Sequence, residues 1–540
     1  WLGLSLVFAT IYGGLAIAEA FSQPYIIQDD ARQHVFWMRR FLDPDLFPND
    51  AIADYFQSVA PPGYATLYRV FAILGVDPVI LSKILPLILG WVTTVFCFGV
   101  CLELRTVPAA GFMAATLLNQ QIWLNEDLVS ATPRAFVYPL FLAFLYFLLR
   151  RKPIVCGLAI AFLGLFYPQY VLVATGILFL RLWTGTDRDR RLCGIGLGVS
   201  AIVILYYASG SGEFGPVISA TEAKTFSEFG GAGNSAFFDN NPWRFFVASP
   251  RSGLFPEHPF RPPLLGMGLA LPPLLRFPKR FPAIAQISPQ ITILGEWLLS
   301  AVGLFAIAHL LLFRLHLPNR YTLHSFRMII ALAAGISLWV IFDAVWRWGK
   351  NCPRRRLVAI AVAGSLGLAI VSGTWFVGKF PKTGYVKGRE PALYEFFARQ
   401  PKDIVIASIA AEADNIPTFS RRSIWVGWEY AVPYHLGYYI PLQERAIALI
   451  QGLYSPDRDR MQELIAGEGI DYILLDRDSF TLDYVFDNRW LRQWYHSHGK
   501  DIRSLYQQGI QPAITDTLGG CSVLETERSV VLSAECLLQF

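Results

Sequence analysis

Charged residues are scarce in this amino-acid sequence. Asp, Glu, Lys and Arg together make up 16% of the 540 residues, whereas about 25% is usual in a soluble domain. Hydrophobic residues make up 54% of the chain and aromatic residues 14%. This balance excludes an ordinary soluble protein. It predicts a polytopic α-helical membrane protein, in which many aromatic rings lie at the membrane interfaces.

A strong excess of one sign of charge is also missing. The formal net charge is +5, and the basic residues occur in short clusters between apolar runs. Such clusters are typical of membrane orientation signals and not of a nucleic-acid surface. We therefore expect no nucleic-acid partner, and membrane lipids around the apolar runs.

Cysteine is rare. The chain has seven cysteines, no Cys-x-x-Cys pair and no Cys/His metal spacing, which excludes a disulfide scaffold and a zinc module. Cys521 and Cys536 flank two strand-like runs, residues 522–525 and 530–533. The two cysteines form either a disulfide across a hairpin, if the compartment is oxidising, or two buried free thiols.

Three catalytic signatures are missing as well. The sequence contains no Gly-x-Ser-x-Gly, no His-Glu-x-x-His and no P-loop. Their absence argues against a serine hydrolase, a zinc peptidase and an ATP-driven pump. The chemistry of this chain must come from other residues.

Long apolar runs fill the first 380 residues. A membrane-spanning helix needs about 20 largely apolar residues. The first run is too long for a signal-peptide core and has no cleavage site, so we expect a retained helix. Residues 63–76 reach only half a span, which predicts a helix along the membrane interface. The candidate spans are residues 2–21, 79–102, 134–149, 192–208, 291–313, 323–346 and 357–377, with shorter ones at 107–118 and 263–275.

The run at residues 153–183 decides the topology. It is long for one span, and Pro168 interrupts it. If it is split there, the basic clusters at residues 150–152, 188–191, 276–280 and 347–356 share one side, which the positive-inside rule makes cytoplasmic. The chain then has about eleven spans and a cytoplasmic N-terminus. An undivided run would put the clusters on opposite sides. The split places three longer loops on the outer face, at residues 22–62, 119–133 and 209–262.

The sequence changes character after residue 380. Residues 403–407 and 470–476 have the pattern of buried strands, and helical stretches at 441–453 and 456–466 lie between them. We therefore expect a multi-spanning module over residues 1–380. A soluble α/β domain over residues 381–540 is expected on the outer face.

The first outer loop begins with an acidic pair, Asp29 and Asp30, directly after the first apolar run. Carboxylates at the membrane surface are partly desolvated, which raises their basicity. A base at this height reaches the polar head of a lipid-linked substrate, so we predict Asp29 or Asp30 as a catalytic base. Arg32 and His34 follow as candidate substrate ligands. Alternatively, the acidic residues simply mark the end of a helix.

The second outer loop carries Glu126 and Asp127. Acidic residues from different loops can share a divalent cation, Mg²⁺ or Mn²⁺, which stabilises a phosphate leaving group. The alternative is a solvated loop. Arg134 pairs either with a phosphate or with Asp127. Arg320, at an outer helix end, either binds a phosphate in a bidentate manner or anchors the helix at the interface.

The soluble region contains the segment Trp-Val-Gly-Trp-Glu-Tyr. Its Trp425, Trp428, Glu429 and Tyr430 combine aromatic faces with polar tips, which suits a sugar or another acceptor. A packed strand end is the alternative. The third outer loop is long and rich in Gly, Phe and Asn, and its Glu222 and Glu228 are further acidic candidates.

Together these features resemble the GT-C superfamily of membrane glycosyltransferases. The resemblance implies transfer of a sugar from a polyprenyl-phosphate-linked donor to an acceptor at the outer face. Asp29 or Asp30 matches the first-loop acid, and Glu126 and Asp127 resemble the metal-binding motif of the oligosaccharyltransferase branch. Residues 425–430 are loosely similar to that branch's Trp-Trp-Asp acceptor motif, with two inserted residues and Glu for Asp. Asp-Asp-Ala-Arg-Gln-His also resembles bacterial GT-C-like proteins, which implies a bacterial inner membrane.

Two other functions remain as alternatives. A transporter or lipid flippase needs ionisable residues inside its spans, and Glu296 and Asp343 are among the few here. No paired halves suggest an inverted repeat. A non-catalytic scaffold that has retained the fold is the third possibility, because fold does not imply function.

Overall fold

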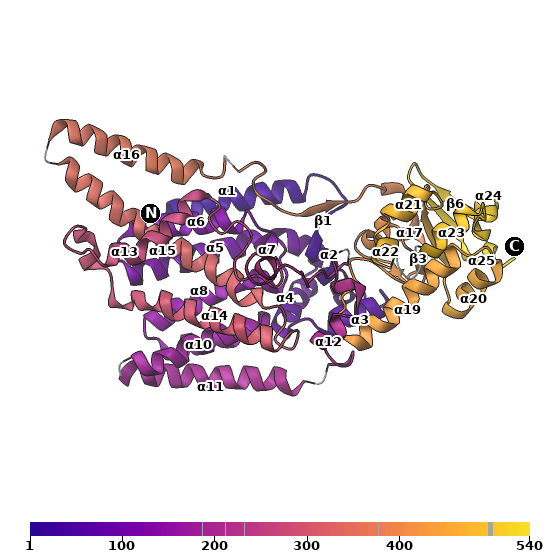
Figure 1. Ribbon diagram of the computed structural model, residues 1–540, viewed down its shortest axis with the longest axis horizontal. Helices are drawn as coiled ribbons and strands as arrows, with labels where there is room; N and C mark the ends of the chain where they lie inside the picture. The colour runs from indigo at the N-terminus through magenta and orange to yellow at the C-terminus, as the bar shows by residue number, and fades with distance from the viewer. Residues whose placement is uncertain are drawn as a thin grey trace.

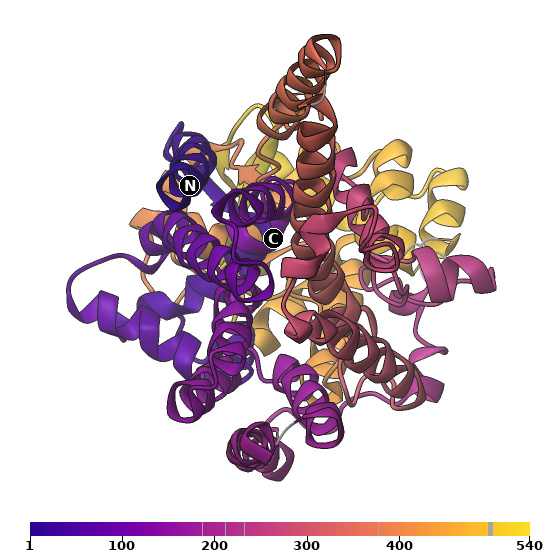
Figure 2. The same cartoon turned by 90° about the vertical axis from the view of Figure 1, so that its left-hand side faces the viewer.

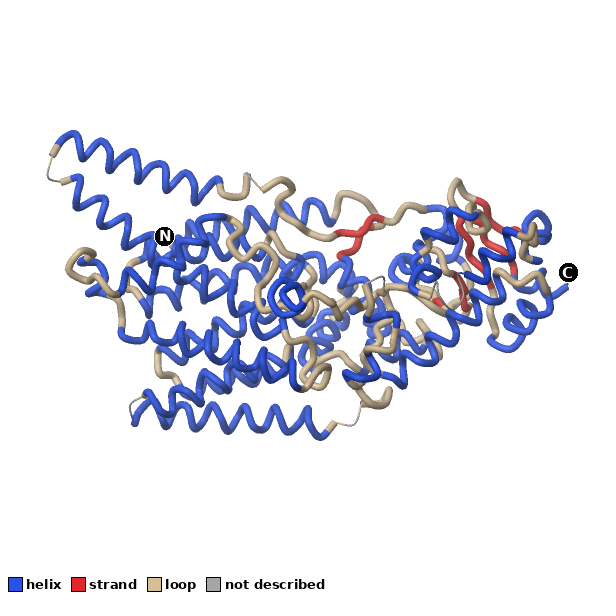
Figure 3. Tube along the Cα trace, in the orientation of Figure 1, coloured by secondary structure: helices blue, strands red, loops and turns tan. Residues whose placement is uncertain are grey.

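The computed structural model describes residues 1–540 except residues 186, 211, 232, 351, 376, 495–499 and 540. The molecule is elongated (Figure 1). A helical bundle occupies one half and the C-terminal domain lies at the far end. Between them lie the three loops that are predicted to be on the outer face, which keep the name outer loops below. Strands of the described chain occur in two places, a small sheet beside the loops and a larger sheet in the C-terminal domain (Figure 3).

Six helices of the described chain are long and apolar enough to cross a membrane. Shorter helices lie among them, at the positions that the apolar runs predict. The number of helices that cross a membrane stays a prediction. The six long helices are α1 (Leu2–Ala20), α5 (Pro78–Leu104), α11 (Asp187–Ser209), α14 (Ile293–Leu310), α15 (Asn319–Gly349) and α16 (Pro353–Ser372). The shorter ones are α6 (Pro108–Ile122), α8 (Val137–Leu149), α9 (Pro153–Phe166), α10 (Gln169–Thr184) and α13 (Leu271–Leu275), which continues η5 (Pro263–Ala270).

The predicted break at Pro168 is confirmed. α9 ends at Phe166 and α10 begins at Gln169, so the long apolar run forms two helices. The half-length run forms α4 (Pro62–Ile73), which packs against α9. The contact is so close that a Cβ on Gly63 would lie 2.7 Å from the Cβ of Leu165.

Small side chains let α15 lie at the centre of the bundle. It packs against α6, α14 and α16. A Cβ added at Gly335 of α15 would lie 2.6 Å from the Cβ of Ala114 of α6, and such small residues bring membrane helices together. α16 lies at the edge of the bundle (Figure 2). Proline at the first helical position begins several of these helices, as its fixed φ favours.

The C-terminal domain is built on a five-stranded sheet with strand order β4-β3-β5-β7-β6. β3, β4 and β5 are parallel, while β7 is antiparallel to both β5 and β6. The two predicted buried strands are β3 and β5, and they are neighbours. The strands are β3 (Val405–Ser408), β4 (Ser423–Ile424), β5 (Tyr472–Asp476), β6 (Ser522–Glu525) and β7 (Ser529–Ser533).

Helices pack against this sheet. The two predicted helices are present, although α19 begins before Pro441 and includes that residue. Cys521 and Cys536 form a disulfide, which decides between the two alternatives for this pair. It ties the start of β6 to α25 (Ala534–Gln539). The other helices include α17 (Pro391–Arg399), α18 (Ile416–Phe419), α19 (Leu436–Leu453), α20 (Arg458–Glu468), α21 (Leu482–Asp487), α22 (Arg489–Gln493), α23 (Lys500–Gln507) and α24 (Leu518–Cys521).

A second, two-stranded sheet joins the first outer loop to the start of the C-terminal domain. β1 (Ile26–Gln28) is antiparallel to β2 (Tyr385–Lys387), with Ile27 opposite Val386. β1 leads directly into α2 (Asp29–Val35), which η1 (Phe36–Phe41) and α3 (Ala51–Ser58) follow. The strand pairing therefore fixes the position of the predicted acidic pair.

The third outer loop is folded, although its sequence shows no obvious structure. It contains α12 (Ala220–Ala223), η3 (Ser227–Phe229) and the π-helical turn η4 (Arg244–Ala248). Its Ile218, Phe229 and Phe237 form a cluster with Phe313 and Leu317, which precede α15. This apolar packing holds the loop against the outer end of the bundle.

The disulfide is expected to stabilise the C-terminal domain. It closes a loop with a sequence separation of 15 residues. Changing both Cys521 and Cys536 to Ser is expected to lower the free energy of unfolding by about 3 kcal/mol, because the unfolded chain gains loop entropy. Chemical denaturation followed by tryptophan fluorescence measures this, with Cys352→Ser as the control. An unchanged midpoint in the double variant would contradict the expectation.

Candidate active site

A cavity of about 610 Å³ lies where the three outer loops meet the C-terminal domain. Residues far apart in the sequence line it, and the outer end of the bundle forms its base. Seven of the residues singled out in the sequence line this cavity: Asp29, Asp30, His34, Arg134, Arg320, Trp428 and Glu429.

Asp29 and Asp30 occupy the first turn of α2. The Asp29 N–H donates to the Gly384 carbonyl at 3.1 Å, which extends the β1–β2 pairing to the acidic pair. The Gln28 side chain caps the helix by accepting from the Ala31 N–H at 3.1 Å. Both carboxylates are accessible, with the Asp29 side chain 43% exposed and that of Asp30 30%.

The two carboxylates contact different arginines. The Arg32 Nη2 lies 2.7 Å from the Asp29 Oδ1. Among the described residues, nothing donates to the other Asp29 oxygen. Asp30 is bound by the Arg134 Nη2 instead. The acidic pair is therefore divided: Asp30 faces the base of the cavity and Asp29 faces the C-terminal domain.

Arg134 connects the acidic residues of two outer loops. Besides binding Asp30, its Nε lies 3.5 Å from the Asp127 Oδ1. It comes from the turn η2 (Pro133–Phe136), which begins α8. The two predicted acidic clusters thus converge, and the cation between Asp30 and Asp127 is a guanidinium group.

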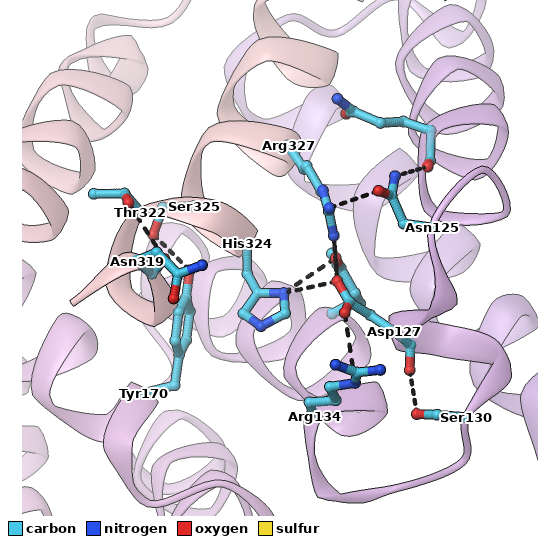
Figure 4. A network of polar contacts seen from close by, with 12 residues as sticks. Asn125, Asp127, Ser130, Arg134, Tyr170, Asn319, Thr322, His324, Ser325 and Arg327 are labelled. Atoms are coloured by element: carbon cyan, nitrogen blue, oxygen red, sulfur yellow. Dashed lines mark hydrogen bonds and ion pairs between the residues drawn. The ribbon is translucent and has the colours of Figure 1, made fainter. Parts of the chain in front are cut away.

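Asp127 belongs to a buried network with α15 (Figure 4). Its Oδ2 binds the Arg327 Nη1 and accepts from the Tyr138 hydroxyl at 3.1 Å. The Nη2 of Arg327 donates to the Asn125 side chain at 2.7 Å. Burial raises the pKa of Asp127, but the surrounding cations, Arg327 foremost, outweigh burial and hold this pKa low, at about 2. Asp127 is therefore ionised at neutral pH.

Glu126 and Asp127 do not fit a shared divalent cation. Glu126 points to Lys382, with its Oε1 3.3 Å from the lysine Nζ, while the oxygens of Asp127 bind arginine and tyrosine. No group of three or more His, Cys, Asp and Glu in the described chain could hold a metal ion. The predicted metal site at these two residues therefore has no support in this arrangement. Arg134 lies where an ion shared by Asp30 and Asp127 would bind.

Two further arginines line the cavity without a carboxylate partner among the described residues. The Nε of Arg320 and the Nη1 of Arg251 are buried and receive no hydrogen-bond acceptor there. Arg251 reaches the cavity because the loop is docked on α15, where the Asn319 N–H donates to the Arg251 carbonyl at 3.4 Å. No motif marks Arg251 as a functional residue. It lies in the third outer loop, in an ordinary Ser-Pro-Arg-Ser segment.

His34 lines the cavity but contributes no charge at neutral pH. Burial lowers the pKa of its imidazole to about 4. The ring packs edge-on against Phe56, with their centroids 5.4 Å apart. His34 can therefore serve a substrate as a neutral hydrogen-bonding group.

Three predicted substrate ligands lie outside the cavity lining. Arg32 is buried behind Asp29, between α2 and the C-terminal domain. Trp425 is buried in the domain core near Arg445, and the fully buried Tyr430 donates its hydroxyl to the Asp414 carbonyl at 3.1 Å. In the aromatic segment only Trp428 and Glu429 reach the cavity. The others pack inward, which favours the packed-strand interpretation for them.

The acidic residues of the third outer loop do not reach the cavity lining either. Glu222 completes a capping box with Ser219. Glu228 is fully buried and holds the loop on the C-terminal domain. Its Oε1 accepts from Tyr439, Gln443, Gln493 and Trp494 at 2.6 to 3.2 Å.

Neither a protein-family model nor a curated protein matches the sequence. Solved structures do resemble the fold. The chain is similar to the apo oligosaccharyltransferase of Archaeoglobus fulgidus, with a TM-score of 0.54 and 14% identity, over 91% of this chain and 71% of that one. It is also similar to apo ArnT from Cupriavidus metallidurans, with a TM-score of 0.50 and 14% identity, over 100% of this chain and 98% of that one. A third similar structure is the mycobacterial arabinofuranosyltransferase AftD, at 14% identity and a TM-score of 0.50, over 89% of this chain and 37% of that one.

All three are GT-C glycosyltransferases, so the predicted resemblance is confirmed for the fold. Related structures hold ligands. One of the Archaeoglobus enzyme AglB contains dolichol-phosphate and an inhibitory peptide, and another contains zinc and sulfate. One of ArnT contains undecaprenyl phosphate.

Removing one partner of the buried Arg327–Asp127 pair is expected to destabilise this region. Changing Arg327 to Gln leaves a buried carboxylate without its main partner, which costs about 3–5 kcal/mol. Adding Asp127→Asn to this variant should restore part of the loss. Thermal unfolding in detergent measures both effects.

The control for that experiment is Arg477→Gln. Arg477 forms an exposed pair with Glu525, and such pairs contribute about 1 kcal/mol or less. An Arg327→Gln variant as stable as this control would show that Asp127 does not depend on Arg327.

Proposed function

We propose that the chain is a glycosyltransferase. It transfers a sugar from a polyprenyl-phosphate-linked donor to an acceptor at the outer face of the membrane. One observation carries the proposal: a single cavity brings an accessible carboxylate, Asp29, together with two arginines that lack acidic partners among the described residues, Arg251 and Arg320. The polyprenyl phosphates bound by AglB and ArnT support the choice of donor.

Arg320 and Arg251 bind the donor phosphate in this proposal. A guanidinium group matches the geometry of phosphate oxygens and stays charged at any physiological pH. Negative charge grows on the phosphate as the glycosidic bond breaks, and fixed donors aimed at it stabilise that charge. Arg134 adds a third guanidinium at the same end of the cavity, oriented by Asp30 and Asp127.

Asp29 is the general base, and Asp30 is a positioning residue. In an inverting displacement the base and the leaving group lie on opposite faces of the sugar ring. Asp30 is bound to Arg134 and so lies on the phosphate side, whereas Asp29 faces the C-terminal domain. The free oxygen of Asp29 takes the proton of the acceptor hydroxyl. The hydroxyl oxygen bonds to the anomeric carbon, and the polyprenyl phosphate leaves with the bonding electrons.

The C-terminal domain supplies the acceptor side of the cavity. Trp428 and Glu429 reach the lining from this domain, and Trp428 packs edge-on against Trp490 with a centroid distance of 5.2 Å. An aromatic face beside a carboxylate suits a hydroxyl-bearing acceptor such as a carbohydrate. We propose that this wall lies on the extracytoplasmic side and that the N-terminus is cytoplasmic.

The transporter alternative has less support. Glu296 of α14 is bound by Arg181 at 2.6 Å, and Asp343 of α15 is bound by Arg347 at 2.6 Å. The first pair joins α10 to α14 and the second lies within α15, so neither requires a transport pathway.

The catalytic assignment is tested by changing Asp29 to Asn. The turnover number for sugar transfer should fall about 100-fold or more, because the acceptor hydroxyl loses its base. Purified protein is assayed with radiolabelled polyprenyl-phosphate-linked hexoses, hexosamines and pentoses, with native membranes as the acceptor source. Asp30→Asn should mainly raise the KM for the donor. The control is Asp45→Asn, in the same loop but exposed. Full activity in the Asp29 variant would refute its role.

The phosphate site is tested without knowledge of the sugar. Arg320→Gln and Arg251→Gln should each weaken the binding of undecaprenyl phosphate about 10- to 100-fold, because each removes a charge-assisted hydrogen bond. Titration calorimetry in detergent measures the Kd. Arg314→Gln is the matched control, since Arg314 is exposed in the loop that precedes Arg320. Equal affinity in all three variants would place the phosphate elsewhere.

A further inference from the structure

Arg32 is buried at the boundary between α2 and the C-terminal domain. Its Nη2 contacts Asp29 at 2.7 Å and lies 3.5 Å from the Glu429 Oε1. Its Nη1 donates to the Asn415 Oδ1 at 2.8 Å. One guanidinium group therefore links the proposed base to two residues of the C-terminal domain. The side chain is only 6% exposed, so solvent screens these interactions weakly.

Asp414 lies next to Asn415 and is almost completely buried, with 1% of its surface exposed. Its Oδ1 accepts from the Glu429 N–H at 3.3 Å. Its Oδ2 is buried and has no hydrogen-bond partner among the described residues. A buried carboxylate oxygen without a donor is costly when it is ionised.

The charges around Asp414 do not balance when it is ionised. The groups that face it are Arg32 from α2, Glu429 and Tyr430 from the aromatic segment, and Arg489 from α22. Glu429 accepts from the Arg489 Nη1 at 3.0 Å, and Arg32 also holds Asp29. Three carboxylates then share two guanidinium groups. When Asp414 is protonated, two carboxylates face two arginines.

We propose that Asp414 is a positioning residue for the base. Its charge, acting through Arg32, sets how tightly the Asp29 carboxylate is held. An ionised Asp414 draws Arg32 toward the C-terminal domain and leaves Asp29 more basic. A protonated Asp414 releases Arg32 to Asp29, which lowers the basicity of Asp29. The C-terminal domain thereby controls a base that belongs to the first outer loop. This inference rests on the proposed function.

Asp414 changes its protonation state near neutral pH. Burial, with a smaller contribution from Glu429, raises the pKa of Asp414 to about 7, although Arg32 and Arg489 oppose the shift. The proposed base should therefore become more effective as the pH rises through neutrality. This pH range suits the extracytoplasmic face of a membrane, where the pH varies with the surroundings.

The first test is the pH profile of turnover. For the wild-type protein the turnover number should rise through about pH 7 as Asp414 ionises. In Asp414→Asn this inflection should be lost, and turnover at about pH 8 should fall severalfold while the donor KM stays unchanged. Asp414→Glu should restore the inflection. Glu395→Gln, at an exposed position of α17 in the same domain, is the control and should leave the profile unchanged.

An inflection retained in Asp414→Asn would overturn the proposal. So would a change in the donor KM with an unchanged pH profile, because that result indicates a purely structural role.

The second test does not depend on sugar transfer. Because the pKa of folded Asp414 lies above that of the unfolded chain, protonation stabilises the fold. This contribution is complete below about pH 4 and is lost as the pH rises through about 7. The melting temperature of the wild-type protein in detergent should therefore fall over this range relative to Asp414→Asn. Parallel curves for the two proteins would refute the charge change at Asp414. The curves can also differ while neither the wild-type protein nor any variant transfers sugar. In that case the proposed function is wrong, and only the protonation of Asp414 is supported.

Discussion

The site depends on one guanidinium group between two carboxylates. Arg134 binds Asp30 of the first outer loop and Asp127 of the second, and Arg327 of α15 binds Asp127 from the other side. Without Arg134, two negative charges would face each other at the base of a cavity with limited access to water, at a large electrostatic cost. The arrangement ties both loops to the outer end of the bundle. It also keeps a positive charge at the end where the phosphate is proposed to bind.

The remaining parts of the site are arranged around Arg134, and each region of the chain contributes different groups. The bundle and the third loop supply the two arginines that have no carboxylate partner among the described residues, the first loop supplies the proposed base, and the C-terminal domain closes the opposite wall. Strand pairing between β1 and β2 and the buried Glu228 hold these parts together, since each joins an outer loop to the start or the body of the C-terminal domain. The cavity therefore exists only in the assembled chain.

Much of this architecture could be predicted from the sequence. Apolar runs interrupted by proline gave the helices, and the distribution of basic clusters favoured the split at Pro168, which the helices α9 and α10 confirm. The convergence of Asp30 and Asp127 was also predictable, because the predicted topology puts both loops on the same side of the membrane. Two short continuous apolar runs indicated the neighbouring strands β3 and β5 of the C-terminal sheet.

The partners of each charge could not be predicted. Glu126 and Asp127 are adjacent in sequence, but successive helical residues point about 100° apart, so one meets Lys382 and the other meets Arg327. For a similar reason of local geometry, Trp425 lies in the core of the C-terminal domain and Trp428 lines the cavity. Arg251 and Asp414 have ordinary sequence surroundings. Their importance arises from tertiary contacts that place a buried charge without a matching partner.

The proposed sugar transfer requires that this cavity bind the phosphate of a polyprenyl carrier. The most direct measurement is photo-crosslinking with a polyprenyl phosphate that carries a diazirine beside the phosphate, followed by mass spectrometry. Crosslinks are expected in the peptides that contain Arg251 and Arg320, and they should be lost when excess undecaprenyl phosphate competes. Competed crosslinks at another site of the bundle, with none in these two peptides, would contradict it.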